Sequence, residues 1–166
     1  MTNVNFNVSP ITDACRAIVN ARIAENWAGP YMVSRGVLHD TRTHKGFVAM
    51  AFEEVIGYIL YNISGENLEI TMLESLRPKQ GIGSALIQAV KSVAKDANCK
   101  YLWLITTNDN TPAIRYYQRY GFSLTAVHIN SMETARKLKP GIPLNGIDDI
   151  PIKHEFEFEI LLYSET

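Results

Sequence analysis

The sequence contains little cysteine, no long apolar run and almost no excess charge. Its two cysteines, Cys15 and Cys99, are too few for a disulfide framework, and we expect free thiols in a reducing compartment. No apolar run approaches the roughly 18 residues of a membrane span, and Met1–Asn5 lacks the basic and apolar regions of a signal peptide. A net charge of -1 gives no general attraction to nucleic acid or to an anionic membrane. We therefore expect a cytoplasmic protein with neither of those partners.

The composition suits a globular protein with a full core, because 46% of the 166 residues are hydrophobic and 20% are charged. No repeat, low-complexity tract or linker divides the sequence. We expect one domain over residues 1–166, with residues 130–152 as an irregular insertion before the last strand.

Hydrophobic periodicity predicts a mixed α/β (α+β) fold that starts with an antiparallel meander. Strands are expected at Val4–Val8, Phe47–Phe52, Val55–Ile63, Leu68–Leu76, Tyr101–Thr106, Phe122–His128 and Ile152–Tyr163. Helices are expected from Pro10 to about Trp27 and at Gly83–Ala97, Thr111–Gly121 and Met132–Leu138. Residues 31–45 are predicted to be irregular. In the last strand, Glu155, Glu157 and Glu159 alternate with apolar residues and are expected in solvent.

A glycine turn, Gln80-Gly81-Ile82-Gly83-Ser84-Ala85, lies between a predicted strand and the clearest predicted helix. Glycines let the backbone approach a ligand closely. The first amides of the helix have no partner within the helix, and the helix dipole is positive there. The turn therefore predicts a site for a phosphate or pyrophosphate.

Spacing distinguishes the kinds of phosphate site. The third position of a dinucleotide fingerprint would hold glycine or alanine, but Leu86 stands there, and the P-loop pattern is absent. Gln80, Gly83 and Ala85 instead satisfy Q-x-x-G-x-A, the pyrophosphate turn of acyl-CoA-dependent acyltransferases. A loop that merely lets strand and helix pack together remains the alternative.

A second motif follows one strand later: Asn110-x-x-Ala113-x-x-Tyr116-Tyr117-x-Arg119-x-Gly121-Phe122. With both motifs in this order, the sequence resembles the GNAT superfamily of acetyl-CoA-dependent N-acetyltransferases, and within it a bacterial subgroup of poorly defined substrate. The resemblance implies a mixed, mostly antiparallel sheet of about six to seven strands flanked by helices. It also implies direct transfer of an acetyl group from acetyl-CoA to a primary amine, on a small molecule or a peptide, without a covalent enzyme intermediate.

The resemblance further implies which residues contact acetyl-CoA. Amides of the glycine turn would hold the pyrophosphate, Lys79 would add positive charge, and the splayed end of the preceding strand would pair with the pantetheine arm and offer one N–H to the thioester oxygen. Lys79 as a solvated turn residue and Asn110 as a plain helix cap remain alternatives. The assigned residues are Glu74, Ser75, Leu76, Lys79, Gln80, Gly81, Ile82, Gly83, Ser84, Ala85, Asn110, Ala113 and Tyr117.

Tyr117 is the predicted catalytic residue, placed by the resemblance near the thioester sulfur. Alternatively, Tyr117 belongs to an apolar face of its helix and only packs into the core. Because a free tyrosine has a pKa of about 10 and a thiol of about 8.5, full proton transfer would be uphill by roughly 2 kcal/mol, and hydrogen bonding to the leaving sulfur would matter more.

Glu69 and Glu74 are the candidate bases for the amine, with Glu74 favoured because it lies nearer the turn. Five residues apart, they face opposite sides of a regular strand unless a bulge intervenes. The four histidines show no metal-ligand spacing, and no metal is expected.

Two alternatives for the function and assembly of the protein stay open. One is an acyl-CoA-binding or sensing module with little catalysis, suggested by the compressed loop at 78–81 and the lack of a convincing base. The other is a homodimer paired through the closing segments.

Overall fold

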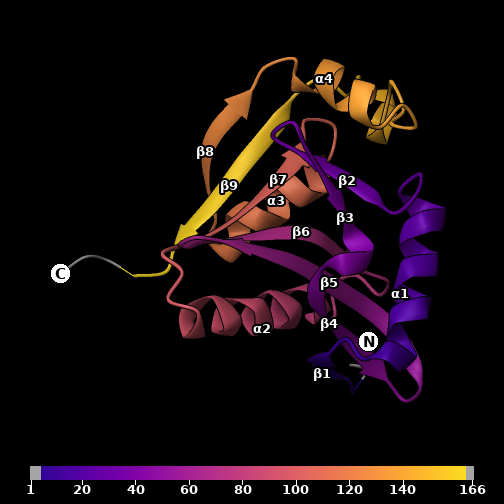
Figure 1. Ribbon diagram of the computed structural model, residues 1–166, viewed down its shortest axis with the longest axis vertical. Helices are drawn as coiled ribbons and strands as arrows, with labels where there is room; N and C mark the ends of the chain where they lie inside the picture. The colour runs from indigo at the N-terminus through magenta and orange to yellow at the C-terminus, as the bar shows by residue number, and fades with distance from the viewer. Residues whose placement is uncertain (1–4, 164–166) are drawn as a thin grey trace.

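The computed structural model describes residues 5–163 and contains a seven-stranded sheet in the order β1-β4-β5-β6-β7-β9-β8 (Figure 1). The strands are β1 (Asn7–Pro10), β4 (Lys45–Ala51), β5 (Glu54–Ser64), β6 (Asn67–Ser75), β7 (Tyr101–Thr107), β8 (Ser123–His128) and β9 (Glu155–Leu161). The helices are α1 (Asp13–Asn26), α2 (Ile82–Asp96), α3 (Thr111–Tyr120) and α4 (Ser131–Leu138). Within the described range β6 and β7 pair in parallel and the other neighbours are antiparallel, which confirms the expected mixed, mostly antiparallel sheet.

The buried apolar side chains form two main clusters that belong to opposite faces of the sheet. On one face, the buried side chains of α2 and α3 pack against alternate residues of the central strands, such as Leu86 and Tyr117 with Leu68. On the other face, α1 contributes Val19 and Ile23, which pack with strand residues including Tyr58. The strongly periodic helix predicted after the glycine turn is therefore present as α2, which begins and ends one residue earlier than predicted.

The N-terminal prediction needs correction. Strand β1 runs to Pro10, so this proline ends a strand instead of opening a helix, and Val4 lies outside the described residues. Proline is tolerated because β1 is an edge strand with one hydrogen-bonded neighbour. Helix α1 begins three residues later, capped by Thr12, whose backbone N–H donates to Cys15 Sγ at 3.2 Å. Both cysteines are buried and free, as expected.

Residues 31–45 were predicted to be irregular, and this is wrong. They form a hairpin of β2 (Tyr31–Ser34) and β3 (Val37–Asp40), followed by a short 3₁₀ helix, η1 (Thr41–Thr43). The two turn residues, Arg35 and Gly36, both have positive φ, 47° and 74°. That conformation suits a two-residue hairpin turn, but its usual sequence signal is Asn-Gly or Asp-Gly, and arginine in the first position concealed it.

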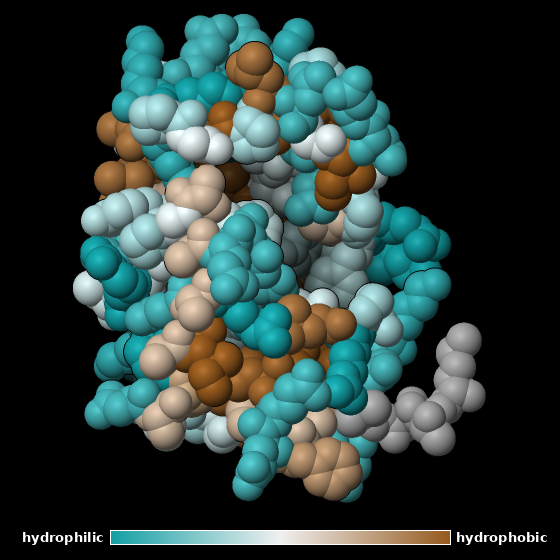
Figure 2. Space-filling model, turned by 90° about the vertical axis from the view of Figure 1, so that its right-hand side faces the viewer, coloured by the Kyte–Doolittle hydropathy of each residue, from teal (hydrophilic) through white to brown (hydrophobic). Residues whose placement is uncertain are grey.

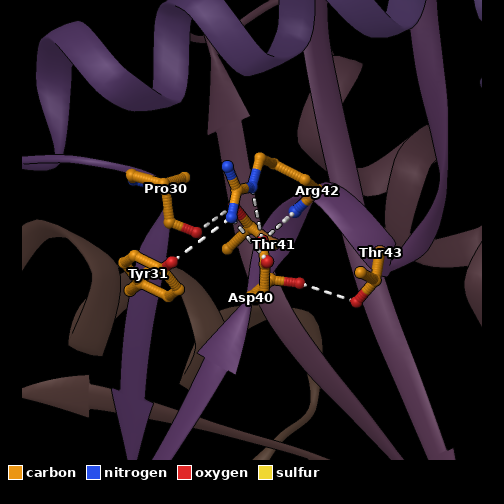
Figure 3. A network of polar contacts seen from close by, with 6 residues as sticks. All are labelled: Pro30, Tyr31, Asp40, Thr41, Arg42 and Thr43. Atoms are coloured by element: carbon orange, nitrogen blue, oxygen red, sulfur yellow. Dashed lines mark hydrogen bonds and ion pairs between the residues drawn. The ribbon is translucent and has the colours of Figure 1, made fainter.

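A polar network fixes the base of this hairpin (Figure 3). Arg42 donates to both carboxylate oxygens of Asp40, at 2.9 and 2.8 Å, and to the Tyr31 hydroxyl at 3.2 Å. Thr41 donates to the Pro30 carbonyl at 2.6 Å. The two ends of the hairpin are thus held to each other, and its tip projects over the sheet.

The last strand also departs from the expectation. It begins at Glu155, not at Ile152, and it lies between β7 and β8 inside the sheet. Glu155 and Glu157 are 1% and 9% exposed, because the hairpin tip covers this face and Arg35 contacts Glu157. The alternation was read correctly, but the face that carries the glutamates is covered. Within residues 5–163, no helix has the length and apolarity to cross a membrane.

Candidate active site

Strands β6 and β7 separate partway along their length. Their pairing runs from Asn67–Tyr101 to Ile70–Leu104, and from there β6 continues to Ser75 paired with β5 alone. Figure 1 shows the two strands diverging, and Figure 2, which views the side toward which they diverge, shows a hollow. The expected splay is present, and it leaves backbone groups of β6 available to an extended ligand that adds as a strand.

The glycine turn connects the end of β6 to α2. Gly81, with φ 77°, precedes the helix, and the first helical hydrogen bond runs from the Ala85 N–H to the Gly81 carbonyl at 3.0 Å. The amides before Ala85 therefore have no acceptor inside the helix. Gln80 Oε1 is buried, with no hydrogen-bond partner among the described residues. The free amides meet the requirements of an anion site at a helix N-terminus, whereas Gln80 Oε1 is an acceptor and does not itself favour an anion.

Packing also requires one of the two glycines. A Cβ on Gly83 would lie 2.9 Å from the Tyr116 hydroxyl oxygen, and that hydroxyl is 3.1 Å from Ser84 Oγ. Lys79 lies in the turn with a left-handed backbone, φ 64°. Arg77, beside it, is held by Glu54 through an ion pair of 2.6 Å.

Helix α3 places the residues of the second motif. Asn110 caps the helix by accepting from the Ala113 N–H at 3.2 Å, so its side chain has the structural role that the sequence left open. Tyr117 is 8% exposed and packs its ring against Phe122 and Phe158. Burial raises the pKa of Tyr117 above its ordinary value, so its hydroxyl keeps its proton at neutral pH.

Tyr117 belongs to the core, and it also lies beside the point where the strands separate. Its neighbour Phe158 pairs with Leu104, the last residue of β7 that pairs with β6. The two roles that the sequence offered for this tyrosine are therefore compatible.

A bulge in β6 changes which way its glutamates point. Tyr61 is opposite Ile70 and Leu60 is opposite Met72, so Thr71 is an extra residue. Ile70 packs under α2, whereas Met72, two residues on, packs under α1. Glu69 and Glu74 consequently lie on the same side of the sheet, which a regular strand would not allow.

Glu69 occupies a mostly buried position, 7% exposed, with one oxygen 3.6 Å from His39 Nε2. Burial raises the pKa of Glu69 to about 7, opposed by Ser34 and Arg35 and reinforced by the glutamates of β9. Burial also lowers the pKa of His39, so this imidazole is neutral near pH 7. A carboxylate of this kind gains and loses a proton around neutral pH, as a general base must.

Glu74 has a different environment near the C-terminal end of α1. It accepts from Asn26 Nδ2 at 3.3 Å, and its other oxygen is buried. The pKa of Tyr58 is raised mainly by burial and, to a smaller extent, by the neighbouring Glu74 carboxylate.

The Glu69 side chain lines a cavity of about 150 Å³ on the hairpin side of the sheet. Its other lining residues come from the hairpin tip and from four neighbouring parts of the sheet: Arg35, Asn62, Ser64, Asn67, Trp103, Glu157 and Glu159. Sequence spacing does not predict that Arg35, Trp103 and Glu157 meet, because a hairpin turn and two strands that are distant in sequence carry them. No group of residues suited to a metal ion occurs within residues 5–163.

Comparison with known proteins agrees with this geometry. The model of the acetyltransferase (GNAT) family matches residues 15–122. The chain is 39% identical over 153 residues to the uncharacterised Bacillus subtilis protein YdhI, covering 91% of this chain and 95% of that protein. It is 33% identical over 151 residues to YxbD from the same organism, covering 90% and 95%.

The fold is also found in a GNAT family acetyltransferase from Elizabethkingia anophelis, solved with acetyl-CoA bound. The TM-score is 0.68 at 20% identity, with 95% of this chain and 98% of that chain covered. The matched region holds the splayed strands and both motifs. This chain belongs to the acetyltransferase (GNAT) family.

Proposed function

We propose that this protein transfers an acetyl group from acetyl-CoA to a primary amine by direct attack on the thioester. The observation that carries the proposal is the continuity of β6: one strand presents an unpaired backbone edge, leads into the free amides of α2, and carries Glu69 at the start of the splay. These are the parts needed to hold an extended arm, bind its phosphates and deprotonate an acceptor.

The turn would bind the pyrophosphate through its amides. Gly81 and the N–H groups before Ala85 supply donors whatever the side chains are, and Gln80 would add its own N–H groups, because its Oε1 can only accept. Lys79 would add a positive charge at the edge of the turn. Thr71 to Ser75 on β6 would pair with the pantetheine arm, and one N–H of this stretch would donate to the thioester oxygen.

Glu69 is the base that we favour over Glu74, although sequence position favoured Glu74. Glu69 lines the cavity and has a pKa of about 7, whereas Glu74 already accepts a hydrogen bond from Asn26. The ionised Glu69 would take one proton from the ammonium form of the acceptor. The free amine would then attack the acetyl carbonyl carbon.

Collapse of the tetrahedral intermediate forms the amide and breaks the carbon–sulfur bond. Tyr117 would donate a hydrogen bond to the departing thiolate, whose proton comes finally from the amine nitrogen or from solvent. Its raised pKa fits this role, because a tyrosine that holds its proton tightly remains a donor and is not itself ionised.

Two measurements test the proposal. Titration calorimetry should detect acetyl-CoA binding that Gly81→Val weakens, because φ 77° is strained for a branched residue. Release of CoA should depend on an added amine and fall in Tyr117→Phe. Binding without release for any amine would identify an acyl-CoA-binding module instead of an enzyme, and an absence of binding would overturn the proposal altogether.

A further inference from the structure

One wall of the cavity beside Glu69 is a cation of the protein itself, Arg35, which contacts an aromatic ring and a carboxylate. The Arg35 guanidinium carbon lies 4.1 Å from the centroid of the Trp103 ring. The same guanidinium contacts Glu157 Oε1 at 3.3 Å, and the other oxygen of Glu157 is 2.8 Å from His128 Nε2. An aromatic face with a carboxylate beside it is a favourable environment for an ammonium or guanidinium group.

We propose that this cavity holds the second cationic group of a small aliphatic di- or polyamine. One amino group of the acceptor lies at Glu69 and is acetylated, while the other lies on Trp103 beside Glu157 and Glu159, where the Arg35 guanidinium lies in the free protein. The inference rests on the acetyl transfer proposed above and names its acceptor class.

The carboxylates around the cavity outnumber the permanent cations that contact them. Glu69, Glu157 and Glu159 line the cavity and Glu155 lies beside it, and within residues 5–163 the permanent cation near them is Arg35. Burial raises the pKa of Glu155 and of Glu159, and Arg35 opposes the shift in both. A cationic ligand beside these buried carboxylates would favour their ionised forms.

One buried carboxylate oxygen of the cluster is also unsatisfied. Glu155 is 1% exposed, and its Oε2 has no hydrogen-bond partner within the described part of the chain. Ser34 is 7% exposed, and its hydroxyl faces Glu69 and helps to stabilise the ionised carboxylate. Native proteins rarely leave such a group unpaired, and Glu155 lies two residues before the cavity-lining Glu157 on β9.

The spacing of the sheet sets the size of the acceptor. Trp103 on β7 is the register partner of Glu69 on β6 and of Glu159 on β9, so the three lie in one row across adjacent strands. Two strand spacings place the Cα atoms of the two glutamates about 10 Å apart, with the indole between them. Their side chains shorten this span, which suits a short alkyl diamine and leaves a longer polyamine to extend outward.

The hairpin allows Arg35 to leave. Arg35 is the first residue of a two-residue turn, and its side chain is 48% exposed. Its side chain can rotate away without breaking the β2–β3 pairing, which begins at Ser34–Val37. An incoming ammonium would therefore replace one cation with another on the same ring.

The test compares acceptors of equal length with the full chain and acetyl-CoA. We expect kcat/KM for 1,4-diaminobutane to exceed that for n-butylamine and 4-amino-1-butanol by about tenfold or more, since one charge-assisted contact is gained. Spermidine should behave like the diamine. Equal values for the diamine and the monoamines would overturn the inference and leave the proposed transferase function intact. If no amine releases CoA while acetyl-CoA still binds, both fail. Preference for a peptide N-terminus would also overturn it.

Variants separate a binding role from a structural one. Glu157→Gln and Glu159→Gln should each lower the diamine-to-monoamine ratio of kcat/KM at least fivefold, whereas Glu25→Gln on the exposed side of α1 should not lower it. Arg35→Ala should lower KM for the diamine, because the competing guanidinium is gone. A merely structural Arg35 would instead raise KM or reduce stability.

Binding can also be observed without turnover. The diamine should change the emission of Trp103 in a saturable way, and Trp103→Phe should remove the change while Trp27 remains. Should one glutamate variant fail to fold, the other and the fluorescence titration still decide the question. A diamine that leaves the emission unchanged and gains no kcat/KM advantage would refute the inference.

Discussion

Replacing Glu69 by glutamine should make the protein more stable at alkaline pH while removing most of its activity. The carboxylate is 7% exposed, and burial raises its pKa from 4.5 to about 7. Between these values the folded state holds a proton that the unfolded state has lost. Stability therefore falls as pH rises through this window, because the ionised carboxylate must remain buried. Glutamine keeps the shape and has no charge to bury.

The size of the effect follows from the two pKa values. Relative to a group that does not titrate, Glu69 would cost roughly 1.4 kcal/mol of folding free energy at pH 5.5 and roughly 3 kcal/mol at pH 8. The advantage of Glu69→Gln should thus grow by about 2 kcal/mol across this range. For a chain of this length, that corresponds to a relative gain in Tm of roughly 4–8 °C.

Thermal unfolding at pH 5.5 and pH 8 measures the stability, and CoA release at the same pH values measures the activity. In the parent protein, kcat/KM should rise with pH, with a midpoint near pH 7. The pH profile of Glu69→Gln should lack this rise. Its kcat/KM at pH 8 should be lower by about 10² or more, the usual contribution of a general base. The exposed Glu25→Gln serves as the matched control in both assays. A Gln variant whose Tm difference is independent of pH, or which retains the rise near pH 7, would refute the reasoning.

Three further substitutions have defined outcomes. Tyr117→Phe should reduce kcat by about 10² with little change in acetyl-CoA affinity by calorimetry, because the ring packs as before and only the donor is lost. Lys139→Met should lower the unfolding free energy in urea by about 2 kcal/mol, since Lys139 Nζ donates to the carbonyls of Trp27 and Tyr31 and two acceptors would be left unpaired. Gly81→Val should cost about 1–2 kcal/mol in the same urea titration, from strain at φ 77°.

The elements that could be predicted are those whose signals are local. Helix α2 has its apolar stripe within fifteen residues, and strand β7 is a short apolar run between turn signals. The glycine turn and the cap of α3 each lie within six residues. The hairpin at 31–40 was missed because its turn is Arg-Gly and its pairing is fixed by the Arg42–Asp40 network, which spacing does not reveal.

The residues of the candidate site also fall into a group that local spacing predicts and a group that it does not. The groups that would hold the donor come from one strand, one turn and one helix in sequence order, so their spacing is readable. The groups around the cavity come from β6, β7, β9 and the hairpin tip. Their alignment depends on the order of strands in the sheet. Glutamates that alternate along β9 look the same in sequence whether water or a hairpin covers them.

The bulge at Thr71 connects these two halves of the site. Without this extra residue Glu74 would face α2, and the side of β6 that faces α1 and the hairpin would carry Glu69 alone. The bulge rotates the strand where β6 leaves β7, so the separation that exposes backbone to the donor coincides with the change of face. Glu69 lies just before that point and is paired into the sheet on both sides, opposite Asn62 and Trp103. Its carboxylate is therefore fixed by the rigid part of the sheet, while the backbone beyond it is free to bind a ligand. A carboxylate held this way needs no ligand-induced ordering, which is why we expect the pH dependence of activity and of stability to report the same group.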